Sequence, residues 1–199
     1  MALVIGGKPE SNFKNPLGLL KDCHRRIEKF LGSQLAVLEE TDGGALNPDQ
    51  RETLLKSLRY FREAAPRHTR DEEDSLFPRM RASVSGEAHA ALDTLAKLES
   101  DHDKADLWHA EVDRLCDQWI ARGGIGGEDK DRLAEDLTSL RALYNHHIHL
   151  EDNFVFPAAA KALDAQAIDE LGREMAARRG IDPDAKLPPL PGGRRGIAV

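Results

Sequence analysis

Apolar residues recur at steps of three and four along four long segments of this 199-residue chain. This spacing is the period of a helix that buries one face. In the fourth segment the residues expected to face inward are Leu133, Leu137, Leu140, Tyr144, His147, Glu151 and Phe154. Glycine-containing breaks at residues 41–44, 83–86 and 123–127 separate the segments, and strand-like alternation of useful length is absent. Because short connections make neighbouring helices antiparallel, the predicted fold is all-α: an up-down-up-down antiparallel four-helix bundle.

The expected bundle covers residues 14–163, after an N-terminal extension of residues 1–13. A shorter amphipathic stretch over residues 164–180 predicts a short fifth C-terminal helix. Residues 181–199 are rich in proline and glycine, which is typical of an extended, flexible tail. Within the second helix, Pro66 is expected to cause a kink because proline lacks the N–H group that the helix ladder needs.

The composition narrows the class of protein. Apolar residues make up 40% of the chain and charged residues 32%, which is enough apolar material for a folded core. The net charge of −7 is spread over interleaved acidic and basic residues, which argues against a nucleic-acid surface. The chain has no apolar run of membrane-spanning length, and Cys23 and Cys116 form no CxxC pair. Its first residues lack the basic region and cleavage pattern of a secretory leader, so we do not expect secretion. We therefore expect a cytoplasmic protein without a membrane or nucleic-acid partner, in an oligomeric state that the sequence leaves open.

One histidine interrupts the apolar face of each of the four helices, at His24, His68, His102 and His147. In an antiparallel hairpin, two residues lie level when they are about equally far from the connecting turn. His68 and His102 are equally far from the second break, and the other neighbouring pairs agree to within about one helical turn. The sequence therefore predicts that four imidazoles meet in one layer of the core.

An internal repeat adds two carboxylates to this layer. His68, Glu72, Glu73 and the pair Phe77-Pro78 recur as His147, Glu151, Asp152 and the pair Phe156-Pro157. The i, i+4 spacing places each histidine and the following glutamate on one helix face, about 6 Å apart along the axis. That separation allows the histidine to bind one metal ion while the carboxylate bridges to a second. Mixed imidazole and carboxylate ligands suit iron, zinc, manganese or cobalt.

This repeated motif, with lone histidines on the first and third helices, resembles the hemerythrin family, specifically the hemerythrin-like HHE cation-binding domains. The resemblance covers roughly residues 14–162. It implies a non-haem centre of two iron ions, joined by an oxo or hydroxo bridge, with zinc or manganese as alternative metals. By analogy, His24 and His68 serve one iron and His102 and His147 the other, while Glu72 and Glu151 bridge the two.

The chain departs from the oxygen-carrying hemerythrins on its third helix. Those carriers have a second histidine four residues after the first, whereas this chain has Asp106 four residues after His102. Asp106 is therefore a less certain candidate ligand, with an exposed helical aspartate as its alternative. Two six-coordinate ions have about twelve positions, and the expected ligands and bridge leave one or two of them free. We expect such a site to react with a small oxidant or gas rather than to carry oxygen reversibly.

Three functions follow from these expectations. The first is a centre that binds, and as an enzyme reduces, oxygen, peroxide or nitric oxide. The second is iron storage or donation, including repair of iron centres. The third is an interaction module in which the metal ion only stabilises the bundle. Near the centre, Tyr144 is expected as a core residue or a hydrogen-bond donor to a bound ligand, and His109 as a structural or outer residue.

Overall fold

The computed structural model of the chain describes residues 11–182, and every regular element within that range is helical. The expected extension and tail therefore lie largely outside the described residues. The elements, among which η marks a π-helical turn, are α1 Pro16–Thr41, α2 Pro48–Glu63, α3 Ala65–Asp71, η1 Glu72–Leu76, α4 Phe77–Ala82, α5 Gly86–Arg122, α6 Gly127–Leu150, η2 Glu151–Val155, α7 Phe156–Ala162 and α8 Ala165–Ala177.

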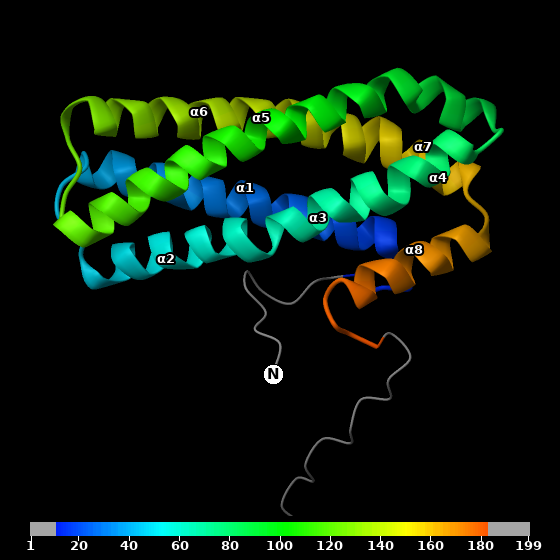
Figure 1. Ribbon diagram of the computed structural model, residues 1–199, viewed down its shortest axis with the longest axis horizontal. Helices are drawn as coiled ribbons and strands as arrows, with labels where there is room; N and C mark the ends of the chain where they lie inside the picture. The colour runs from blue at the N-terminus through cyan, green and yellow to red at the C-terminus, as the bar shows by residue number, and fades with distance from the viewer. Residues whose placement is uncertain (1–10, 183–199) are drawn as a thin grey trace, which may run out of the picture.

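The long helices lie side by side in a helical bundle (Figure 1). Helix α1 contacts α2 and α6, and α5 contacts both α6 and α2. Helices α2, α3 and α4 follow one another along the bundle, and α8 lies beside this column, where it contacts α1, α3 and η1 (Figure 1). Within the described range, none of the helices is long and apolar enough to cross a membrane.

Local sequence signals account for the breaks in the helices. Asn47 caps α2 through a hydrogen bond from the N–H of Gln50, and Pro48 takes the first helical position, where no N–H is needed. Farther along, α2 ends at Glu63 and α3 begins at Ala65, directly before Pro66. The predicted interruption near this proline is confirmed, and it falls at Ala64, about one helical turn before His68.

Two π-helical turns, η1 and η2, interrupt the second and fourth columns of helix. In η1 the N–H of Phe77 donates to the carbonyl of Glu72, and in η2 the N–H of Phe156 donates to the carbonyl of Glu151. A turn of this kind accommodates one extra residue and therefore changes which residues face the core beyond it. The inward orientation predicted for Phe154 is wrong for this reason, because its side chain is 56% exposed while Val155 is buried.

The apolar core consists of two clusters separated by a polar layer. One cluster includes Leu58, Trp119 and Leu137, and the other includes Phe77, Leu95 and Phe156. On α1, His24 lies between Leu20 of the second cluster and Ile27 of the first. The buried polar layer at this depth contains His24, His68, Glu72, His102, His147 and Glu151. Since apolar packing on both sides excludes water, these groups must be satisfied by one another or by a ligand.

Helix α8 closes the outer side of η1. Leu171 and Met175 enter the second apolar cluster. Beyond the helix, Arg178 Nη1 and Arg179 Nη2 lie 3.0 and 2.6 Å from the carboxylate of Asp71, which is completely buried. Burial raises the pKa of Asp71 even though both arginines lower it. The residues that follow α8 therefore form ion pairs with Asp71, the residue directly before Glu72.

Because α8 lies close to the backbone at Phe13, we expect replacement of Gly172 by alanine to destabilise the protein. A Cβ atom at Gly172 would lie 1.9 Å from the carbonyl oxygen of Phe13. We expect Gly172→Ala to lower the free energy of unfolding by about 1–3 kcal/mol, although alanine is the better helix former. The matched control is Gly32→Ala on an open face of α1, which we expect to raise that free energy by up to about 1 kcal/mol. Urea unfolding measures both, and an unchanged Gly172→Ala protein would contradict the close packing.

Candidate metal centre

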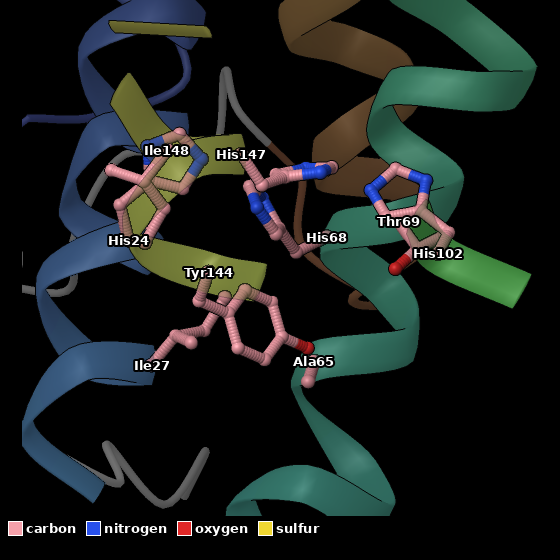
Figure 2. A pocket seen from close by; sticks show the side chains of 9 residues that line it. All are labelled: His24, Ile27, Ala65, His68, Thr69, His102, Tyr144, His147 and Ile148. Carbon is pink, nitrogen blue, oxygen red and sulfur yellow. The ribbon is translucent and has the colours of Figure 1, made fainter. Parts of the chain in front are cut away.

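Four histidine rings from four different helices meet in the polar layer. The ring centroids of His24 and His68 are 4.9 Å apart, and those of His102 and His147 are 4.7 Å apart. Figure 2 shows the four rings around one small cavity. All four histidines are buried. The equal depths inferred from the sequence are thus present in the structure.

Two glutamates complete the cluster and belong to both halves of it. One potential metal-binding group comprises His24, His68, Glu72 and Glu151, and the other comprises His102, His147 and the same two glutamates. Glu72 Oε1 lies 3.4 Å from His68 Nε2, and Glu72 Oε2 lies 3.4 Å from His102 Nε2. Glu151 Oε2 lies 3.0 Å from His24 Nε2 and 3.2 Å from His147 Nε2. Each glutamate therefore reaches histidines of both groups.

The buried donor atoms of the cluster fit metal ions better than they fit one another. Although the glutamate oxygens lie close to the imidazole nitrogens, both carboxylate oxygens of Glu72 and of Glu151, together with Nε2 of His24, are buried and make no hydrogen bond of normal geometry among the described residues. A buried carboxylate is costly unless it is paired or coordinates a metal. Imidazole nitrogens and carboxylate oxygens are ligands that iron, zinc and manganese accept. The six residues present therefore fit a centre of two cations.

The electrostatics of the cluster keep its two glutamates negatively charged. Burial alone would lower the pKa of His102, but Glu72, Glu151 and Glu73 raise it to about 9. Burial likewise opposes charge on His24, whose pKa is nevertheless raised by Asp152 and both glutamates. For His68 burial dominates and lowers the pKa to about 4. The histidines in turn hold the pKa values of both glutamates below the ordinary range. Both carboxylates are therefore anionic at neutral pH.

Each π-helical turn begins at one of the two buried glutamates. Glu72 is the first residue of η1, and Glu151 is the first residue of η2. The residue after each of them is also acidic and contacts a histidine of the cluster from outside: Glu73 lies at His102 and Asp152 at His24. Sequence reasoning missed this second contact. The signal was present, because both copies of the repeat carry two consecutive acidic residues.

A cavity of about 10 Å³ adjoins the cluster, and all four histidines line it (Figure 2). This volume is about that needed for a single water molecule. Tyr144 also lines the cavity, and its hydroxyl lies 3.0 Å from Nε2 of His109. The His109 ring stacks on Phe61 at 4.3 Å, and burial lowers its pKa to about 4. Tyr144 and His109 thus form a neutral polar pair beside the cluster.

The remaining candidate ligand, Asp106, is not part of the cluster. Asp106 has an exposed side chain and belongs to neither potential metal-binding group, so the structure does not bring it to the cluster. His146 contacts Lys97, and His149 contacts Asn153, both on the exposed surface. The helix that carries His102 turns Asp106 outward because the neighbouring Ala105 occupies the buried face.

Comparisons with known proteins agree with this geometry. Residues 15–159 match the hemerythrin HHE cation-binding domain family. The chain is also similar to an uncharacterised protein of Haemophilus influenzae, with 26% identity over 173 residues that cover 86% of this chain and 94% of that protein. The family match spans all six residues of the buried cluster and both π-helical turns. The chain therefore belongs to the hemerythrin HHE cation-binding domain family, and its histidine and glutamate clusters are suited to a metal site.

Proposed function

We propose that the protein holds two iron ions in this cluster and uses them to bind or reduce a small molecule such as oxygen, peroxide or nitric oxide. In the proposed arrangement, His24 and His68 bind one ion, His102 and His147 bind the other, and Glu72 and Glu151 bridge them. When bound, the ions supply Lewis acidity and electrons to the small molecule. The observation that carries this proposal is the cavity of about 10 Å³ lined by all four histidines.

The size and surroundings of the cavity favour a ligand of a few atoms. Ile27, Ala65 and Ile148 line it together with the histidines, so most of its wall is apolar or imidazole. Asp106 stays outside the cluster, which leaves two coordination positions free in the count made from the sequence. A buried centre with free positions beside a small cavity supports small-molecule chemistry.

In this proposal the hydroxyl of Tyr144 is the hydrogen-bond donor to the small molecule. Burial raises the pKa of Tyr144, which keeps the phenol protonated. When the proton of neutral His109 is on Nε2, the imidazole donates to the phenol oxygen and leaves the O–H of Tyr144 free to donate into the cavity. We expect Tyr144→Phe to leave the iron content unchanged and to speed nitric oxide dissociation about tenfold, as the loss of about one hydrogen bond predicts. Stopped-flow trapping of the released gas measures this rate, and an unchanged rate would exclude the donor role.

Metal analysis combined with an absorption spectrum tests the proposed function. We expect about two iron ions in each chain and near-ultraviolet bands from the oxidised centre. Rapid mixing of the reduced protein with nitric oxide or peroxide should then give binding or turnover. A stable, reversible oxygen complex would indicate a carrier instead. One colourless zinc ion would indicate a structural metal, and rapid loss of iron to a mild chelator would indicate iron donation.

A further inference from the structure

Each half of the cluster is contacted from outside by an acidic residue of the other half. Glu73 Oε1 lies 2.7 Å from Nδ1 of His102, and Asp152 Oδ1 lies 3.0 Å from Nδ1 of His24. Glu73 comes from the first copy of the sequence repeat and contacts a histidine of the second copy. Asp152 comes from the second copy and contacts a histidine of the first. The two contacts therefore cross between the halves in opposite directions.

Both acidic residues are placed to act on a histidine without binding an ion themselves. Their side chains are 34% and 28% exposed, whereas the glutamates that precede them, Glu72 and Glu151, are completely buried. Neither Glu73 nor Asp152 belongs to a potential metal-binding group. The ring nitrogen that each contacts is Nδ1, and Nε2 of the same ring faces the buried glutamates. Each acidic residue therefore lies on the far side of the histidine from the cluster.

The other two histidines have no such support. Nδ1 of His68 and Nδ1 of His147 are buried without a hydrogen-bond partner in the described part of the chain. The nearest carboxylate to the latter, that of Asp101, is 4.0 Å away, which is beyond hydrogen-bond length. Each potential metal-binding group thus contains one histidine with an acidic partner and one without.

We propose that Glu73 and Asp152 are positioning residues, each of which sets the affinity of the ion held by the opposite half of the repeat. When Nδ1–H of a histidine donates to a carboxylate, the lone pair stays on Nε2, the ring orientation is fixed and the nitrogen becomes more basic. Asp152 thereby strengthens the binding of the ion at His24 and His68. Glu73 strengthens the binding of the ion at His102 and His147. This inference rests on the proposed two-ion centre.

Release of iron(II) to a coloured chelator tests the proposal on the full chain under anaerobic conditions. The unaltered protein is expected to hold two equivalents. In Glu73→Gln we expect one equivalent to leave about 10–100-fold faster while the other keeps its original rate, and the same for Asp152→Asn. The double variant should release both quickly. Glu73→Asp and Asp152→Glu keep the charge and should restore most of the slow release, which a purely steric role would not produce.

A second pair of variants assigns each effect to one ion. His68→Ala removes a ligand of the first ion and leaves the second ion to be measured alone. In that background Glu73→Gln should speed release and Asp152→Asn should not. Asp74→Asn is the matched control, since Asp74 lies in the same π-helical turn, is 58% exposed and belongs to neither potential metal-binding group. Melting curves of the metal-free proteins should coincide, because both acidic residues are partly exposed.

The outcomes separate this inference from the proposed function. Suppose the unaltered protein binds two equivalents of iron. If the variants then release iron at the original rates, or if either variant speeds the release of both ions equally, the crossed positioning is wrong and the two-ion centre stands. If the unaltered protein takes up no iron, the two-ion centre fails and this inference fails with it.

Discussion

Glu72→Ala is expected to weaken the binding of both metal ions by more than about 100-fold, whereas His68→Ala weakens only one. The reason is that Glu72 Oε1 faces His68 and Glu72 Oε2 faces His102, so one carboxylate serves both halves of the cluster. Titration with iron(II), followed by metal analysis after gel filtration, measures the number of ions retained. We expect no ion in the first variant and one in the second.

Asp74→Ala serves as the control for this comparison because it removes an exposed carboxylate two residues from Glu72. It should retain both ions. If Glu72→Ala retained one ion at full affinity, Glu72 would be a terminal ligand and not a bridge. A second carboxylate at the same depth, Glu151, is expected to reproduce the double loss when it is replaced by alanine.

Removal of the metal is expected to cause the largest loss of stability in this protein. The cluster contains two anionic glutamates, both completely buried, among four imidazoles in the middle of the core. An ion present at 1,000 times its dissociation constant stabilises the folded state by about 4 kcal/mol, and two ions by about 8 kcal/mol. For a chain of this length, about 2–4 °C in melting temperature corresponds to each kcal/mol. We therefore expect a chelator to lower the melting temperature by about 15 °C or more.

The matched control for metal removal is the double variant Glu72→Gln and Glu151→Gln. It keeps the shape of both side chains but removes the two buried charges that the ions would neutralise. Its melting temperature, measured by circular dichroism, should not respond to either added metal or chelator. An unaltered protein whose melting temperature is equally insensitive to metal would contradict a centre inside the core.

The principal features of the cluster follow from local spacing alone. His24, His68, His102 and His147 share one depth because a helix rises by a constant amount for each residue and short turns set the relative offset of neighbouring helices. Glu72 and Glu151 face the same way as the preceding histidines because four residues make about one helical turn. Pro66 interrupts its helix for an equally local reason, the missing N–H group.

The orientation of some side chains near the cluster depended on the tertiary structure. The periodicity of the sequence assumes regular α-helical turns, so it placed Phe154 in the core, whereas η2 turns that side chain outward. It also gave no reason to prefer an outward Asp106 to an inward one, because a helical position next to the buried stripe can face either way.

The amino-acid sequence by itself determined that this chain forms helices, that four histidines and two glutamates share one depth, and that they suit a metal site. Those properties depend only on spacing along the chain. The tertiary structure decided that Glu73 and Asp152 contact His102 and His24, and that a small cavity adjoins the cluster. These contacts join residues far apart in the sequence, so they depend on how the helices pack against one another.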